Sequence, residues 1–180
     1  MPRNIEIKAR IDSVESLLPM ARAVAGAEPV LIEQDDSFFA VPHGRLKLRQ
    51  FADGSAELIQ YHRADIADAK ASDYVRVPVA GAEAAAALRE ALTRACGLLG
   101  RVRKQRLLLM AGATRIHLDR VEGLGDFMEL EVVLQDGQGD SEGRAVADAL
   151  MRSLGLAASV WLAGSYLDLM QGLNRGHPAT

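Results

Sequence analysis

Charged side chains recur at alternate positions in five short segments of the sequence. The segments are 4–10, 47–49, 104–106, 115–119 and 129–131. Because side chains alternate across a β-strand, residues two apart share one face, so each predicted strand carries its charges together. The forked donors of Arg and the compact charge of Lys suit phosphate oxygens. The carboxylates beside them suit a hard cation such as Mg²⁺ or Mn²⁺, so the charges together favour a metal-bound triphosphate.

The elements that must position these charges are mostly strands joined as hairpins. Seven strands are predicted from period-two or β-rich patterning, over residues 4–10, 44–51, 57–63, 72–79, 101–109, 114–120 and 127–134. Turn residues separate several of them, at 42–44, 52–55, 111–113 and 122–126. Helices are predicted from a capping box at 12–15 to about residue 25, and over 82–96, 141–154 and 159–170. Strands bunched into hairpins favour an antiparallel α+β sheet or a barrel.

Length and composition restrict the class of protein. The chain has 180 residues, the size of one domain, which we expect over 1–171 with a flexible tail at 172–180. A formal charge of −3 and 4% aromatic residues disfavour nucleic-acid binding. The longest apolar run, 107–113, is about a third of the roughly 20 residues that a membrane helix needs. The lone Cys96 and the lack of an apolar leader favour the cytoplasm.

Two arrangements of the charged faces remain open at this point. In an ordinary half-exposed antiparallel sheet, the charges lie in water. If the sheet instead closes into a barrel with helices outside, the charged face becomes a lumen. Unpaired charge in such a lumen is too costly unless a ligand or metal completes it. Basic residues on at least three strands, with carboxylates on two others, favour the barrel.

The order and spacing of the charged segments resemble the CYTH domains, also called triphosphate tunnel metalloenzymes. The resemblance spans nearly the whole chain and rests on residues 4–8, 34–39, 45–49, 58–63, 104–106, 115–119 and 123–131. It implies an α+β fold in which an eight-stranded antiparallel β-barrel forms a tunnel, with helices packed outside. It also implies a triphosphate held by basic side chains and a divalent metal, Mg²⁺ or Mn²⁺, held by acidic ones.

The resemblance assigns roles to individual residues. Catalytic roles fall to Glu6, Lys8 and Asp119. The triphosphate would contact Lys8, Lys47, Arg49, Arg63, Lys104, Arg106 and Arg115. The metal would be held by Glu6, Asp119, Glu129 and Glu131. Asn4 replaces the first Glu of the family's Glu-x-Glu-x-Lys signature, which puts a second metal in doubt because a neutral amide adds no charge. Tyr61 stands where many relatives have a basic residue.

The subgroup resemblance, over 3–10 and 117–131, is closest to class IV adenylate cyclases, which convert ATP to cyclic AMP and pyrophosphate. Two alternatives stay open. One is a triphosphatase that acts on tripolyphosphate or thiamine triphosphate. The other, motivated by Asn4, is a non-catalytic nucleotide or polyphosphate binding protein. The partner is a small-molecule triphosphate in each case, and a homodimer through an exposed apolar helix face also stays open. His117 is expected to be a hydrogen-bonded barrel residue rather than a ligand.

Overall fold

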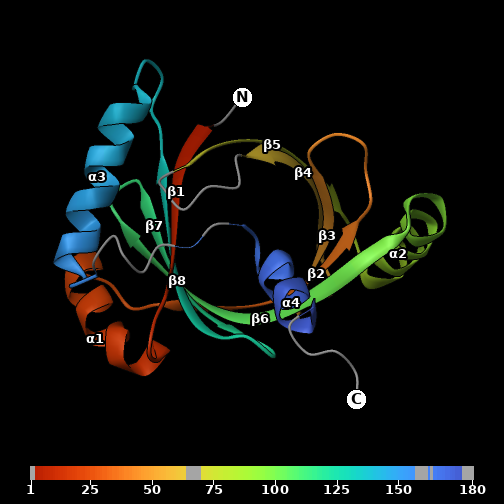
Figure 1. The fold of residues 1–180 in the computed structure, drawn as a ribbon, viewed down its shortest axis with the longest axis horizontal. Helices are drawn as coiled ribbons and strands as arrows, with labels where there is room; N and C mark the ends of the chain where they lie inside the picture. The colour runs from red at the N-terminus through yellow and green to blue at the C-terminus, as the bar shows by residue number, and fades with distance from the viewer. Residues whose placement is uncertain (1–2, 64–69, 157–161, 163, 176–180) are drawn as a thin grey trace.

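The computed structural model describes residues 3–63, 70–156, 162 and 164–175. The strands of this part are β1 (Arg3–Arg10), β2 (Val30–Phe39), β3 (Arg45–Phe51), β4 (Ala56–Arg63), β5 (Lys70–Val79), β6 (Leu98–Ala111), β7 (Thr114–Val121) and β8 (Gly125–Val133). The helices are α1 (Val14–Ala25), α2 (Ala82–Cys96), α3 (Asp140–Ser153) and α4 (Tyr166–Arg175). The strands close into an antiparallel barrel in the order β1-β5-β4-β3-β2-β6-β7-β8 (Figure 1). The expected α+β barrel fold is therefore confirmed.

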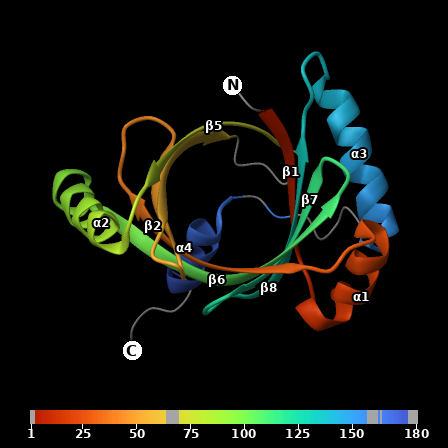
Figure 2. The same cartoon turned by 180° about the vertical axis from the view of Figure 1, so that it is seen from behind.

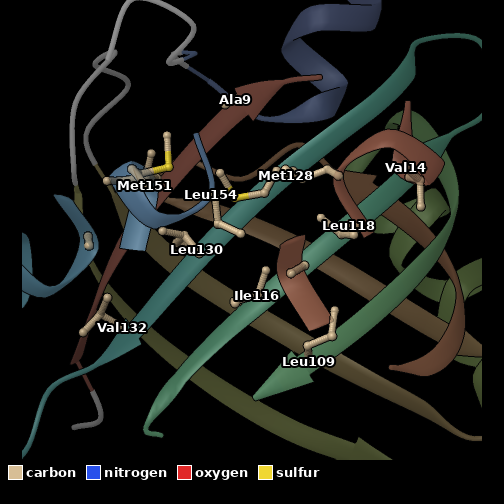
Figure 3. Packing of buried hydrophobic residues seen from close by; sticks show 14 of the residues in the cluster. Ala9, Val14, Leu109, Ile116, Leu118, Met128, Leu130, Val132, Met151 and Leu154 are labelled. Carbon is tan, nitrogen blue, oxygen red and sulfur yellow. The ribbon is translucent and has the colours of Figure 1, made fainter. Parts of the chain in front are cut away.

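The main hydrophobic core lies outside the barrel, between the β1, β6, β7 and β8 wall and helices α1 and α3 (Figure 3). Alternation explains it, because Ile5, Ile7 and Ala9 point out of the barrel while their neighbours point in. Helix α3 approaches β1 closely at Gly143, where an added Cβ would lie 2.8 Å from Ile5 Cγ1. A larger residue there would push the helix away from the strand.

Helix α2 covers a separate part of the outer barrel surface. A small core forms where Ala85 of this helix meets Phe39, Leu48 and Ala56, from β2, β3 and β4. Figure 2 shows that α2 lies on one side of the barrel and that α1 and α3 lie on the other. The outer face of β5 is less covered, since Val75 and Val77 are both about half exposed. The helices therefore support two sectors of the wall.

Helix α4 closes one end of the barrel. Tyr166 and Leu167 pack against Phe38 and Val102, near the ends of β2 and β6, and against Phe127 of β8. Gly100 permits this approach, because a Cβ there would lie 2.6 Å from Leu167 Cδ1. The Arg45 guanidinium also donates to Ser165 Oγ and pairs with Asp168, both at 2.8 Å. Contacts to several strands thus hold α4 across the barrel end.

The predicted elements agree with the structure apart from β2 and α4. No strand was predicted over Val30–Phe39, although this segment forms β2 between β3 and β6. The last helix begins at Tyr166, and its expected start at 159–161 lies outside the described residues. It continues to Arg175, so residues 172–175 of the expected tail are helical, while 176–180 are outside the description. Within the described chain, no helix is long and apolar enough to cross a membrane.

Candidate functional site

The barrel encloses a cavity of about 350 Å³ whose lining comes from all eight strands and from the start of α4. The predicted site residues that line it are Glu6, Lys8, Lys47, Arg49, Lys104, Arg106, Arg115, Glu129 and Glu131. Asp119 is fully buried behind this lining, and the side chain of Arg63 lies outside the described part. Of the described lining residues, seven are Lys or Arg and five are Asp or Glu. Arg76 is exposed and Asp119 adds a sixth acid, so the unexposed bases and acids of the site number six each.

One group of charges, the Asp36 cluster, consists of Asp36, Lys47 and Arg49. Asp36 of β2 lies directly opposite Arg49 of β3 in the strand register. Arg49 Nε and Nη2 donate to the two carboxylate oxygens, each at 2.7 Å, and Lys47 Nζ donates to Oδ2 at 2.8 Å. A bidentate guanidinium–carboxylate pair has a fixed geometry, so Asp36 orients Arg49 in the lumen wall.

The Asp36 cluster has unusual acid–base properties. Burial by itself would raise the pKa of Asp36, but the charges of Arg49 and Lys47 offset it and hold the pKa below its usual range. Burial and the neighbouring Arg49 lower the pKa of Lys47 to about 7, despite the opposing effect of Asp36. Two cations share one carboxylate here. An added anion would therefore favour the protonated form of Lys47.

A second group, the Asp119 cluster, consists of Asp119, Lys104, Arg106 and Tyr166. Asp119 of β7 lies opposite Arg106 of β6 in the register. Arg106 Nε and Nη2 donate to its two oxygens at 2.6 and 2.5 Å, and Lys104 Nζ donates to Oδ2 at 3.1 Å. The Tyr166 hydroxyl donates to the same Oδ2 at 2.9 Å. Asp119 thus joins the lumen wall to α4.

Burial affects the titration of this second cluster as well. It would raise the pKa of Asp119, but Arg106 and Lys104 offset it and keep the pKa below its usual range. Burial and Arg106 lower the pKa of Lys104 to about 8. Burial, with the nearby charges of Glu129 and Asp119, raises the pKa of Tyr166 well above its usual range. The phenol therefore stays protonated and donates to Asp119.

Glu129 extends the Asp119 cluster toward β1. It accepts from Arg106 Nη2 at 2.6 Å and pairs with Lys8 Nζ at 3.0 Å. Burial opposes the ionised form, but Lys8 and Arg106 hold the pKa of Glu129 well below its usual range. His117 Nδ1 lies 3.8 Å from Glu129, too far for a hydrogen bond, and has no partner in the described structure. The expected hydrogen bond of His117 is therefore not seen at this nitrogen, and the residue is one of those that line the lumen.

The residues that could hold a metal lie where β1 meets β8. Glu6 and Glu131 are directly opposite in the register and both line the cavity, so two carboxylates occupy paired positions on neighbouring strands. Asn4 Nδ2 donates to Glu131 at 2.5 Å, and its buried Oδ1 has no hydrogen-bond partner among the described residues. Arg115 also pairs with Glu131, at 2.9 Å. These hard oxygens fit Mg²⁺ or Mn²⁺.

The full predicted ligand set is not assembled around one point. In the part of the chain that the structure describes, no group of three or more His, Cys, Asp or Glu side chains is placed to hold a metal. Asp119 and Glu129 accept hydrogen bonds from Arg106, while Glu6 and Glu131 lie farther along β1 and β8. The metal roles of these four carboxylates and the catalytic roles of Glu6, Lys8 and Asp119 stay predictions.

Sequence reasoning missed several residues of the lumen. Asp36 was part of the segment that carries the resemblance but received no role, and Glu57, Tyr74 and Arg76 were not considered. A signal for Tyr74 and Arg76 was present, because Val75 and Val77 alternate with them in a predicted strand. The alternation in this predicted strand, 72–79, does not by itself show which of its two faces is the inner one.

Comparisons with known proteins agree with the barrel. The PH1012 protein of Pyrococcus horikoshii OT3 is 25% identical with a TM-score of 0.80, and the match covers 92% of this chain and 98% of that one. A candidate adenylate cyclase from Vibrio parahaemolyticus is 19% identical with a TM-score of 0.72, covering 93% and 97%. Hippeastrum HpAC1, a candidate adenylyl cyclase described as having a dominant triphosphatase activity, is 14% identical with a TM-score of 0.66, covering 94% and 95%.

The likeness to these structures supports the fold, and the family follows from the sequence match. A search of the curated proteins finds no match. The family model of the CYTH domain, in contrast, matches residues 2–160, which include all eight strands of the barrel. The match also includes both Asp clusters apart from Tyr166. The chain therefore belongs to the CYTH domain family.

Proposed function

We propose that the protein is a metal-dependent enzyme that acts on a triphosphate bound in the lumen. Its reaction is that of a class IV adenylate cyclase, which converts ATP to cyclic AMP and pyrophosphate. The observation that carries the proposal is the convergence of Lys and Arg side chains from four strands, β1, β3, β6 and β7, on one cavity. Two of these bases, Lys47 and Arg49, share the single carboxylate of Asp36, so a bound polyanion can give them further charge-assisted hydrogen bonds.

The basic residues would bind and orient the phosphates. Arg49 and Arg106 are each fixed by a bidentate carboxylate, so little reorganisation is needed when phosphate oxygens arrive. Lys47 and Lys104 add compact positive charge beside them. Held in this way, the ATP molecule can be bent so that its ribose 3′-hydroxyl oxygen faces the α-phosphorus. That oxygen then forms the new bond, the bond to the pyrophosphate breaks, and the hydroxyl proton is released.

A divalent cation would complete the site where β1 meets β8. Glu6, Glu131 and the Asn4 amide oxygen would hold it, with Glu129 and Asp119 as the further predicted acids. When bound, the cation stabilises the negative charge that develops on the phosphate oxygens. The likeness to the Vibrio candidate adenylate cyclase supports this choice of reaction.

A triphosphatase is the second candidate reaction. In that case water attacks the γ-phosphorus, the bond from this phosphorus to the bridging oxygen breaks, and the diphosphate leaves while the γ-phosphoryl group becomes inorganic phosphate. The described activity of the Hippeastrum relative favours it. A third candidate, a non-catalytic triphosphate-binding protein, is motivated by Asn4, because the amide replaces a charged metal ligand of the family signature.

A substrate panel separates these candidates. The purified chain is incubated with ATP, thiamine triphosphate or tripolyphosphate, each with Mg²⁺ or Mn²⁺, and both cyclic AMP and free phosphate are measured. Cyclic AMP with pyrophosphate is the expected result. Free phosphate instead identifies a triphosphatase. Tight binding without turnover, unchanged by Asn4→Glu, identifies the binding protein.

A pair of variants tests whether the lumen is the site. Lys47→Met removes one phosphate contact while Arg49 still satisfies Asp36, so the fold is retained and turnover at limiting ATP is expected to fall about 100-fold or more. Arg101→Gln is the matched control, because Arg101 pairs with Asp35 and is not among the lumen-lining residues. Equal turnover in the two variants would show that catalysis occurs elsewhere.

A further inference from the structure

The start of helix α4 is fixed by its own cap and by a tie to β3. Asp168 N donates to Ser165 Oγ at 3.2 Å, and Ser165 N donates to Asp168 Oδ2 at 2.7 Å, so the two residues cap the helix reciprocally. Arg45 Nη1 contacts both cap side chains at 2.8 Å. Tyr166, which follows the cap residue Ser165, is 6% exposed and lines the cavity. The cap thus fixes the backbone from which Tyr166 reaches the lumen.

Two lysines of the lumen lie over the ring of Tyr166. Lys8 Nζ of β1 is 4.0 Å from the ring centre, and Lys104 Nζ of β6 is 4.9 Å from it. Both lysine side chains are only 4% exposed. Strands β1 and β6 are not neighbours in the barrel, so no strand register sets these two lysines side by side. The ring of Tyr166 is a contact that they share.

The contacts of the two lysines hold their ammonium groups in place. Lys8 pairs with Glu129 at 3.0 Å and Lys104 pairs with Asp119 at 3.1 Å. The Tyr166 hydroxyl donates to Asp119 at 2.9 Å, which fixes the phenol. The attraction between an ammonium group and an aromatic ring is stronger where water is excluded. An ammonium group that both a carboxylate and a ring hold loses little freedom when a phosphate binds it.

Packing of α4 accounts for only part of this arrangement. Tyr166 and Leu167 both belong to the hydrophobic cluster that holds α4 against the barrel. Leu167 packs closely on β6, because a Cβ at Gly100 would lie 2.6 Å from Leu167 Cδ1. Tyr166 adds the contacts to Lys8 and Lys104. The two neighbouring residues therefore allow packing of the helix to be separated from contact with the cations.

We propose that Tyr166 is a positioning residue of the triphosphate site and that it acts through Lys8 and Lys104. Its ring keeps the two ammonium groups at the cavity wall, where they bind phosphate oxygens. One end of the triphosphate chain then lies at α4, next to this ring. Tripolyphosphate and ATP depend on Tyr166 equally, because the residue acts on the phosphates that both contain. The inference rests on the proposed function, since it needs a lumen that binds phosphates.

Affinity measurements on two variants of Tyr166 test the inference. Tripolyphosphate and ATP are titrated calorimetrically into each variant in EDTA, which prevents turnover. Tyr166→Leu removes the ring and is expected to weaken both ligands about tenfold. Tyr166→Phe keeps the ring and loses only the hydroxyl, so both affinities are expected to stay within about threefold of the wild type.

Leu167→Ala is the matched control, because it loosens the packing of α4 and leaves the ring of Tyr166 in the chain. It is expected to lower the midpoint of thermal unfolding and to leave both affinities unchanged. If Leu167→Ala weakens the ligands as much as Tyr166→Leu does, affinity depends on the docking of α4, and the inference is wrong. The inference is also wrong if Tyr166→Phe binds as weakly as Tyr166→Leu, or if only ATP is weakened.

The Lys47→Met variant distinguishes failure of this inference from failure of the proposed function. If Lys47→Met weakens tripolyphosphate while Tyr166→Leu binds it like the wild type, the lumen binds phosphates and only the role of Tyr166 is wrong. If neither tripolyphosphate nor ATP binds the wild type, both proposals are wrong.

Discussion

The Asp36 and Asp119 clusters use the same local pattern in two different settings. In each, a Lys-x-Arg sequence on one strand meets an Asp directly opposite the Arg on the next strand. The side chains of Lys47 and Arg49 are 14% and 13% exposed, whereas those of Lys104 and Arg106 are 4% and 8% exposed. The Asp36 cluster joins β2 to β3. The Asp119 cluster joins β6 and β7 to α4 through Tyr166, and to β8 through Glu129.

The difference shows that the same set of Lys, Arg and Asp side chains can have two roles, which depend on how deeply the set is buried. Asp119 is fully buried and accepts hydrogen bonds from three side chains. Its loss leaves buried cations without a counter-charge, which lowers the stability of the fold. The side chains of the Asp36 cluster are more exposed, so replacing water by a ligand there costs less free energy. We therefore expect the Asp119 cluster to contribute more to stability and the Asp36 cluster to contribute more to the pH dependence of binding.

The largest expected effect comes from Asp119→Asn, which keeps the side-chain shape and removes the charge. It should lower the free energy of unfolding by about 3–5 kcal/mol, because Lys104 and Arg106 lose their shared carboxylate. Asp36→Asn should cost less, about 1–3 kcal/mol, since Lys47 and Arg49 can take up water. Urea unfolding of both variants at pH 7 measures the difference. Equal losses would remove the distinction between the clusters.

An intermediate effect concerns pH. Lys47 and Lys104, with pKa values of about 7 and 8, lose their protons as the pH rises, so triphosphate affinity should fall between pH 7 and 9. The affinity can fall by at most about tenfold per pH unit for each proton that the protein takes up on binding. Calorimetry in two buffers of different ionisation enthalpy counts those protons. Lys47→Met should remove the part of the pH dependence of affinity that lies nearest pH 7. If the affinity of this variant changes with pH as it does in the wild type, other groups cause the dependence.

The same lysines affect the ligand-free protein in the opposite direction. Their pKa values are lower in the folded chain than the ordinary value of 10.5, so the unfolded chain binds more protons between these pH values. The two lysines therefore make the free energy of unfolding rise with pH above about 7. Unfolding and binding measured over the same pH range should thus show slopes of opposite sign.

The smallest effect is expected for Arg101→Gln. Arg101 forms a bidentate pair with Asp35 like that of Arg49 with Asp36, but its side chain is 40% exposed. Exposed pairs contribute about 0–1 kcal/mol, so the variant should lose less than that in urea unfolding. A loss as large as that of Asp36→Asn would show that burial does not set the ranking.

Strand prediction succeeded where one face of the strand is apolar and failed at β2. In β1, Ile5 and Ile7 alternate with charged residues because they meet the outer core while their neighbours face the lumen. In β2, Gln34 and Asp36 face the lumen, yet Glu33 and Asp35 on the other face are also polar. Neither Glu33 nor Asp35 belongs to a hydrophobic cluster of the described residues, and the hydrophobic alternation that marks a strand is absent here.

The candidate site was predicted in its charges but not in its contacts. Alternation alone places Lys47, Arg49, Lys104 and Arg106 on inner faces. It does not reveal that Asp36 shares two of these bases, because that depends on which strands become neighbours and in which register. Nor does it place Tyr166, which reaches Asp119 from 47 residues away in the chain.

Helix α4 lies at one end of the barrel, where the Tyr166 ring lies beneath Lys8 and Lys104, with ring-centre distances of 4.0 and 4.9 Å. We therefore expect substrate and products to pass through the opposite end of the barrel. A fragment released next to Tyr166 departs only after the fragment nearer the mouth has gone. The deeper product should therefore compete with incoming substrate, and its identity would show which way round the substrate enters.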